Sequence, residues 1–201
     1  MVFERAYIKM LRRICSEVRK CNPEVLETTI EIAVEIARQG VEKSCGTLFV
    51  VGDEEEVLKR SKPLILDPLE RYPKAAKDIR DANVQGTIKE LAKLDGAFII
   101  SGDGYVLSAA RYIEASSRGI NLPMGFGSRH MAAASISRET DAVAVVVSED
   151  DGGVRIFDDG ELVTEVMIGI WDLEMIKPRI NGDYEKIVDK DLNLTMIVKT
   201  T

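Results

Sequence analysis

The chain has 201 residues, of which 45% are hydrophobic and 30% charged, a composition typical of a soluble globular protein with a sizeable core. Its formal net charge of -7 argues against a nucleic-acid coat protein or a protein that covers an anionic membrane, because both need a basic face. We therefore expect neither nucleic acid nor membrane as a partner. A nucleotide ligand remains compatible, since it needs only a local positive site and a metal ion.

The three cysteines, Cys15, Cys21 and Cys45, form no Cys-x-x-Cys pair. Their number and scatter predict reduced, buried thiols rather than a disulfide framework or a zinc site. No apolar run approaches the roughly 18 residues that a membrane span needs, and the first residues lack the pattern of a signal peptide. We expect a cytoplasmic protein.

Residues 1–44 predict a small N-terminal helical unit. Apolar residues recur at helical spacing over residues 4–20, and a second helix is expected from Pro23 to about Gln39, with Asn22 as N-cap and Gly40 as C-cap. We interpret these helices as core-packing elements and keep a role in partner binding or oligomerisation as an alternative.

A buried strand is predicted over residues 46–51, where an apolar run lies between two glycines. The acidic run at 53–56 indicates a solvated turn or a helix start. Residues 61–82 are punctuated by prolines and predict a partly ordered excursion. A helix is expected over 83–93, with Asn83 as its cap.

Residues 97–101 and 105–113 predict two strands joined by a tight turn. Asp95 then lies between the predicted helix 83–93 and the predicted strand 97–101. It is next to Gly96, which allows a ligand to approach the backbone closely. Such an aspartate could instead merely end the helix or cap a turn, and spacing alone leaves both interpretations open.

A glycine-rich turn becomes a helix near residue 128, and the only histidine of the chain, His130, lies there. Ser128 is the expected N-cap. A helix start presents unpaired N–H groups and a positive dipole end, and Arg129 adds a planar fork for phosphate oxygens. His130 can bind a metal ion or donate a hydrogen bond. The pattern indicates a phosphate site, with a plain packing device as the alternative.

Strands are also expected over 142–148, over the hairpin 154–163 and over 192–198. The first is apolar throughout, which favours a central position. We predict a mixed α/β fold with a largely antiparallel central sheet flanked by helices, because hairpins dominate and no dinucleotide-binding or phosphate-loop motif is present. We expect a main domain over 45–170 and a C-terminal extension over 171–201 that packs on it.

Two motifs together resemble the diadenylate cyclase family, whose members condense two ATP into cyclic di-AMP. They are Leu-Asp-Gly-Ala at residues 94–97 and Gly-Ser-Arg-His at 127–130. The run from 136 to 149 resembles the family's Ser-x-x-Thr-Asp-Ala…Val-Ser-Glu pattern. The resemblance covers roughly residues 45–163. It departs at Ser128, where the family has threonine, and at Met131, where an arginine commonly follows the histidine.

The resemblance implies metal-assisted attack of a ribose 3′-hydroxyl on an α-phosphate across a face-to-face homodimer, with Mn²⁺ or Mg²⁺ as cofactor. A monomer is then expected to bind ATP without turning it over. The expected catalytic residues are Asp95, Gly96, Arg129 and His130. The expected ATP-binding residues are Gly96, Ala97, Gly127, Ser128, Arg129 and His130. The expected metal ligands are Asp95, His130 and Glu149.

Three alternatives remain open at this point. Met131 is compatible with a non-catalytic module that binds ATP or a cyclic dinucleotide. The N-terminal helices are compatible with a structural or partner-binding protein. Transfer of AMP to another acceptor is the third alternative.

Overall fold

The structure is a computed structural model that describes residues 10–15, 19–39, 46–64 and 66–200. The helices are α2 (Pro23–Gln39), α3 (Glu54–Lys59), α4 (Ala82–Leu91) and α5 (Ser128–Glu139), with a short 3-10 turn η1 (Lys74–Ala76). The strands are β1 (Thr47–Val51), β2 (Ser61–Pro63), β3 (Ala97–Ile100), β4 (Val106–Ile113), β5 (Val143–Val147), β6 (Val154–Asp158), β7 (Glu161–Ile168), β8 (Tyr184–Asp189) and β9 (Leu194–Lys199).

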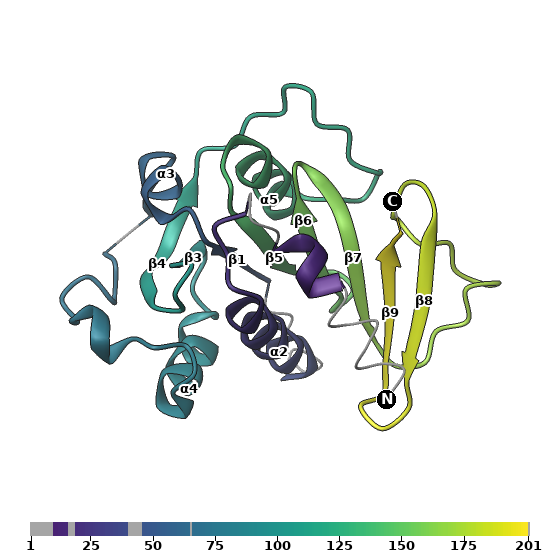
Figure 1. The fold of residues 1–201 in the computed structure, drawn as a ribbon, viewed down its shortest axis with the longest axis horizontal. Coiled ribbons are helices and arrows are strands. Elements are labelled where there is room, and N and C mark those ends of the chain that lie inside the picture. The colour runs from purple at the N-terminus through teal and green to yellow at the C-terminus, as the bar shows by residue number, and fades with distance from the viewer. Residues whose placement is uncertain (1–9, 16–18, 40–45, 65, 201) are drawn as a thin grey trace.

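All of these strands belong to one sheet, in the order β2-β4-β3-β1-β5-β6-β7-β9-β8. Neighbouring strands are antiparallel except for β1 and β3, which are parallel. The predicted mixed α/β fold with a largely antiparallel sheet is therefore confirmed. The β8–β9 hairpin extends the sheet at one end (Figure 1), because β9 pairs with β7.

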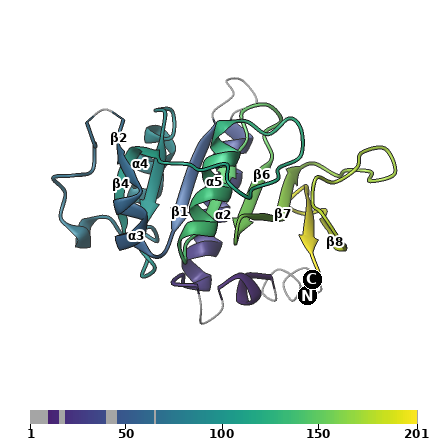
Figure 2. The ribbon, with the colours of Figure 1, turned by 90° about the horizontal axis from the view of Figure 1, so that it is seen from above.

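Two helices cover opposite faces of the sheet, α2 on one and α5 on the other (Figures 1 and 2). We call the two hydrophobic layers the α2-side core and the α5-side core. In β1, Phe49 and Val51 lie in the α2-side core, whereas Leu48 and Val50 lie in the α5-side core. This alternation is the period of two of a strand, so β1 reads as continuously apolar because both of its faces are covered.

The predicted position of β5 is confirmed, since it lies between β1 and β6 and all five of its residues are buried. The acidic run at 53–56 forms a helix start, which is one of its two predicted interpretations, because Glu54 begins α3. Two strands were not predicted, namely the short edge strand β2 and β8, half of whose residues are exposed. An exposed edge strand has no apolar face, so its sequence gives no alternating pattern.

The helix predicted from Pro23 to about Gln39 is confirmed as α2. Asn22 caps α2, because its Oδ1 accepts a hydrogen bond from the N–H of Glu24 at 3.0 Å. Before it, residues 10–14 are helical and residues 19–20 are not, so the helix does not reach residue 20. The rest of that predicted helix and Gly40 lie outside the described residues.

Two predicted helix caps are wrong by one or two residues. The N-cap of α5 is Gly127, whose carbonyl accepts from the N–H of Met131 at 3.2 Å, so Ser128 is the first helical residue. The N-cap of α4 is Asp81, whose carboxylate accepts from the N–H of Asn83 at 2.7 Å. Asp81 and Asn83 are both good capping residues, and the helix begins at the earlier one.

The expectation of reduced thiols is wrong for two of the cysteines. Cys15 and Cys21 are joined as a disulfide, with their Cα atoms 5.5 Å apart. This distance lies in the range that a disulfide spans, which spacing in the sequence does not reveal. Cys45 lies outside the described residues.

Within the described ranges, no helix combines the length and the apolar character that crossing a membrane requires.

A buried cluster fixes the first turn of α5 to the sheet. The His130 ring stacks on Phe126, with ring centroids 4.4 Å apart, and meets Phe157 edge-on. Its Nε2 lies 3.4 Å from Nη1 of Arg155, whose guanidinium also pairs with the buried Glu165 at 3.1 Å. The stacked ring therefore holds α5 in place rather than pointing to solvent.

Burial and, to a smaller extent, the positive charge of the neighbouring Arg155 together lower the pKa of His130 to about 4. The imidazole is therefore neutral in the folded protein near pH 7. A neutral ring suits this place, because a second cation beside Arg155 would be repelled.

We predict that this histidine makes the fold acid-sensitive. Its folded pKa lies below its ordinary value of 6.5, so the unfolded chain takes up the proton first as the pH falls. The stability that depends on neutral His130 is complete above pH 6.5 and is lost progressively down to pH 4, by about 3 kcal/mol in all. Urea unfolding of wild type and His130→Gln at several pH values measures the difference, and parallel curves for the two proteins would contradict it.

Candidate functional site

Two stretches far apart in the sequence line one cavity of about 380 Å³. Asp95 and Gly96 come from the turn before β3, Ala97 begins that strand, and Ser128 and Arg129 come from the first turn of α5. The structure thus brings together the two motifs that the sequence singled out. The volume lies within the range of small-ligand sites.

Arg129 joins two carboxylates at this cavity. Its Nη2 donates to Oδ1 of Asp95 at 2.9 Å, and its Nη1 donates to Oε2 of Glu149 at 3.0 Å. The Asp95 side chain is 78% exposed and that of Glu149 is 51% exposed. Ion pairs this exposed add little to stability, so their main effect is to orient the guanidinium. The buried Nε of Arg129 has no hydrogen-bond partner among the described residues.

Gly96 is required by the backbone of the site. Its φ is +110°, and a Cβ built on it would lie 2.7 Å from the carbonyl carbon of Ala110 and 2.8 Å from the N atom of Arg111. Any side chain would push the turn away from β4. Because the N–H of Gly96 donates to Oδ1 of Asp95 at 2.9 Å, the same turn also orients that carboxylate.

Gly46 is a site residue that sequence reasoning missed. A Cβ at this position would lie 2.8 Å from Nη1 of Arg129 and 3.0 Å from Cβ of Glu149. The ion pair between Arg129 and Glu149 therefore lies against bare backbone. The only signal for Gly46 in the sequence is a glycine directly before a buried strand, and such a glycine usually marks just the start of the strand.

Two further lining residues, Arg111 and Tyr112, were also missed, and Met131, noted in the sequence as a departure from the family, lines the cavity as well. Arg111 and Tyr112 belong to β4, and Met131 follows His130 in α5. The signal for Arg111 was a charged residue within an otherwise apolar strand pattern. We treated that stretch only as the returning half of a hairpin.

The start of α5 opens onto the cavity. Gly127 has a φ of -87°, which any residue adopts, and a Cβ built on it would meet nothing within 4 Å. Ser128, Arg129, Met131 and Ala132 of the first turns line the cavity. Unpaired N–H groups and the positive end of the helix dipole favour an anion at such a place.

His130 is not part of this group. It is 5% exposed and lies in the cluster with Phe126 and Arg155 described above. Within the described ranges, no three or more His, Cys, Asp or Glu side chains are placed to hold a metal ion. The predicted metal set of Asp95, His130 and Glu149 therefore does not assemble in this structure, because α5 turns the imidazole towards the sheet.

The two remaining carboxylates suit a different kind of metal site. Mg²⁺ and Mn²⁺ prefer oxygen ligands, and Mg²⁺ is commonly held by one or two carboxylates together with substrate phosphates. Both hydrogen bonds of the Asp95 carboxylate use Oδ1, which leaves Oδ2 without a bond to a described residue. Asp95 and Glu149 thus fit a divalent ion that arrives with a phosphate ligand.

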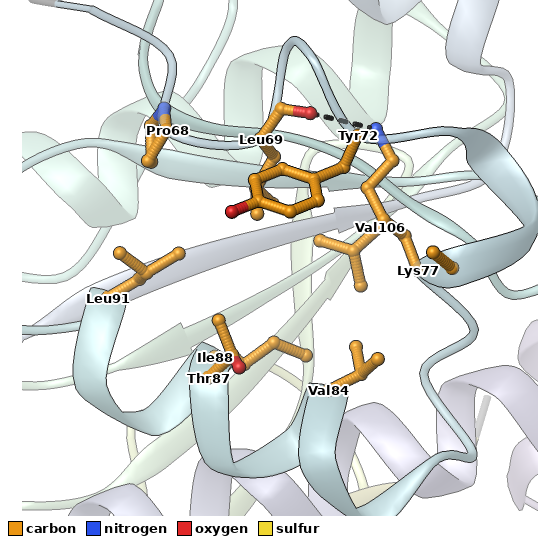
Figure 3. A pocket seen from close by; sticks show the side chains of 10 residues that line it. Pro68, Leu69, Tyr72, Lys77, Val84, Thr87, Ile88, Leu91 and Val106 are labelled. Atoms are coloured by element: carbon orange, nitrogen blue, oxygen red, sulfur yellow. Dashed lines mark hydrogen bonds between the residues drawn. The ribbon is translucent and has the colours of Figure 1, made fainter.

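A second cavity, also of about 380 Å³, lies between α4 and the segment before it (Figure 3). Its walls are largely apolar side chains such as Leu69, Ile88 and Val106. Its one charged lining residue, Lys77, already donates to the carbonyls of Leu69 at 3.2 Å and Leu107 at 3.1 Å. The cavity lined by Asp95, Arg111 and Arg129 is therefore the better candidate for binding a polyanionic ligand.

Known proteins are similar to this chain. A diadenylate cyclase of Methanocaldococcus jannaschii is 50% identical over 141 residues, which are 70% of this chain and 44% of that protein. A diadenylate cyclase of Haloferax volcanii is 40% identical over 148 residues, 73% of this chain and 54% of that protein. The chain thus spans about half the length of these curated relatives.

A solved structure titled as a hypothetical membrane spanning protein from Bacillus cereus superposes with a TM-score of 0.50. It is 19% identical and the match covers 67% of this chain and 61% of that one, so it supports the fold alone. The family model described as DisA bacterial checkpoint controller nucleotide-binding matches residues 34–162. The chain therefore belongs to this nucleotide-binding family, abbreviated DAC.

Proposed function

We propose that this protein is a diadenylate cyclase, which condenses two ATP into cyclic di-AMP and releases two pyrophosphates. The observation that carries the proposal is the contact of Arg129 with Asp95 and Glu149 at a cavity beside the start of α5. Family membership and the names of the two archaeal relatives support it. The proposal includes a cytoplasmic location, where ATP is available.

The phosphates of ATP would bind at the first turn of α5. A guanidinium binds phosphate oxygens in pairs, and Ser128 and the helix N-terminus supply further donors beside it. The present partners of Arg129 are exposed carboxylates, so replacing one of them by phosphate costs little. Gly127 leaves room for this approach.

The reaction joins the 3′-oxygen of one nucleotide to the α-phosphorus of another, while the bond from that phosphorus to pyrophosphate breaks. Charge gathers on the phosphoryl oxygens, so Arg129 and the helix dipole act by stabilising it in place. Asp95 and Glu149 would hold a divalent ion, which when bound neutralises phosphate charge and favours ionisation of the hydroxyl. Asp95 is kept in position by the Gly96 turn.

Cyclic di-AMP has two-fold symmetry, and the reaction must occur twice between the same two nucleotides. A matching active site consists of two half-sites that face each other across a two-fold axis. Asp95 and Arg129 of one protomer contact each other, so each half-site would hold one nucleotide with its own residues. The attack then takes place between the half-sites.

A non-catalytic module that binds ATP or a cyclic dinucleotide is the second candidate. Met131 favours it, since a thioether in the cavity wall cannot compensate phosphate charge as an arginine would. Incubation with ATP and Mn²⁺ or Mg²⁺, followed by mass spectrometry, separates the two. Formation of cyclic di-AMP supports the cyclase, and tight ATP binding without product supports the non-catalytic module. Absence of ATP binding favours a structural or partner-binding protein. A linear or mixed product would indicate AMP transfer to another acceptor.

We predict that Asp95→Asn lowers the rate of product formation by at least about a hundredfold, because it removes a carboxylate that would hold the divalent ion. ATP binding is expected to change much less, since Arg129 and the start of α5 remain. Product formation and ATP binding should be measured on the same samples. Asp183→Asn, an exposed change on the C-terminal side of the chain, is the control and should behave as wild type. Near-normal turnover by Asp95→Asn would contradict the role.

We predict that Gly96→Ala destabilises the fold by about 1–3 kcal/mol and abolishes ATP binding, since a methyl group meets the β4 backbone and the positive φ disfavours it. Gly86→Ala is a matched control. A Cβ on Gly86, inside α4, meets nothing within 4 Å, so that change should stabilise the protein by about 0.5–1 kcal/mol. Thermal unfolding and ATP titration of both variants measure the effect. Equal behaviour of the two would contradict the close approach.

We predict that the activity per protein molecule falls on dilution, because two half-sites must meet before reaction. ATP binding per molecule should stay constant over the same range. Light scattering at each concentration gives the fraction of dimer. A constant specific activity in a sample that is fully monomeric would rule out the shared site.

A further inference from the structure

We propose that Arg111 binds the phosphate groups of the nucleotide and supplies the positive charge that Met131 does not. This inference rests on the proposed nucleotide site and identifies an additional binding residue in it. Arg111 and Met131 line the same cavity, one from β4 and the other from α5.

An irregularity in β4 delivers Arg111 to this cavity. Ala109 belongs to the α2-side core and Ile113 to the α5-side core, although residues four apart in a regular strand share a face. Between them, Ala110 has a φ of 53°, and the pairing with β3 shifts register. The shift moves Arg111 to the face of Ile113, which is the face that α5 covers. Without it, the guanidinium would point to the α2 side.

A left-handed alanine costs on the order of 1 kcal/mol, because its Cβ crowds the following carbonyl. The N atom of Arg111 and the carbonyl carbon of Ala110 are also the atoms that Gly96 approaches. The irregular part of β4 therefore has two effects on the site. It lies against the turn that carries Asp95, and it changes the face to which Arg111 points, as bulges beside active sites often do.

Among the described residues, the hydrogen bonds of Arg111 all go to neutral oxygens. Its Nε donates to Oγ of Ser61 at 2.9 Å, its Nη2 to the carbonyl of Ser61 at 2.8 Å and its Nη1 to Oγ of Ser108 at 3.4 Å. It forms no ion pair with a carboxylate in the described part of the chain. A guanidinium has five N–H groups, so two remain for a ligand.

The charge of this side chain is therefore unmatched. Burial lowers the pKa of Arg111, and the charge of Asp67 only partly opposes this. The Asp67 carboxylate is occupied, since it accepts from the N–H groups of Leu69 and Ala109 and from the hydroxyl of Ser108. Arginine nevertheless stays protonated, so the cavity wall carries a cation that an anionic ligand would compensate.

Arg129 differs in this respect, because two carboxylates already neutralise it. A triphosphate that enters the cavity must displace those partners at Arg129, whereas Arg111 requires no displacement. The two arginines together can compensate more phosphate charge than Arg129 alone. Arg111 would thus supply the positive charge that the site lacks because residue 131 is a methionine and not an arginine.

The test compares binding of a non-cleavable ATP analogue and of adenosine to wild type, Arg111→Met and Arg71→Met, by calorimetry. Met keeps the apolar stem of the side chain, and Arg71 is an exposed arginine that lies outside the cavity. We expect Arg111→Met to weaken the analogue at least about tenfold and adenosine less than about twofold. Arg71→Met should match wild type. Adding Met131→Arg to Arg111→Met should restore most of the lost affinity.

Unchanged analogue binding, or equal losses for the analogue and adenosine, would overturn the inference. If Arg111→Met does not melt cooperatively, Arg111→Lys decides instead. It keeps the charge, so it should weaken the analogue only a few-fold and leave adenosine unchanged, and equal losses again count against the inference. Wild type that binds the analogue but makes no product would overturn the cyclase and leave Arg111 as a phosphate ligand. Wild type that binds no analogue would overturn both.

Discussion

The ion pairs of Arg129 with Asp95 and Glu149 are the interaction on which the site depends, and the sheet topology makes them possible. β1 and β3 are parallel, so Gly46 and Asp95, which precede them, lie at the same edge of the sheet. β5 runs antiparallel to β1, and Thr47 pairs with Val147, so Glu149 emerges at that edge as well. Three central strands thus place a glycine and two carboxylates beneath one arginine. The parallel pair is the single exception in an antiparallel sheet, and without it Asp95 would lie at the opposite edge.

The rigidity of this edge comes from burial on both faces. β1 and β5 are apolar on each side, and α2 and α5 cover the two layers. Apolar burial contributes roughly 25 cal/mol per Å², so these strands are the parts of the fold least free to move. The carboxylates of Asp95 and Glu149 are exposed, so their ion pairs with Arg129 add little stability. The buried strands therefore provide the stability, and the turns next to them carry the proposed binding residues.

The regular strands and the two site motifs could be predicted from the sequence, whereas the helix cap, the disulfide and the irregular strand could not. Apolar runs identified β1, β3 and β5, and the motifs at Asp95 and Arg129 identified two halves of one cavity, because periodicity and turn chemistry are local signals. The cap at Gly127, the disulfide of Cys15 with Cys21 and the β4 irregularity depend on how the chain folds back on itself. Arg111 was missed for that reason, since the register shift at Ala110 decides which face it reaches and an alanine gives no sign of a positive φ. The predicted boundaries at residues 44 and 170 stay predictions.

The neighbouring Arg129 and His130 show how one helix turn contributes both to stability and to the proposed binding site. Successive residues of a helix point roughly 100° apart, so the two side chains cannot share an environment. Ser128, Arg129, Met131 and Ala132 line the cavity, whereas His130, Ala133, Ala134 and Ser137 are buried towards the sheet. The imidazole is therefore coupled to the site through the backbone of α5 rather than through a shared ligand. The contacts of His130 with Phe157 and Arg155, both of β6, hold this face of α5 against the sheet, while Arg129 faces Asp95. If the proposed function holds, a change at His130 is expected to alter nucleotide binding only by shifting α5, whereas a change at Arg129 removes a proposed phosphate contact.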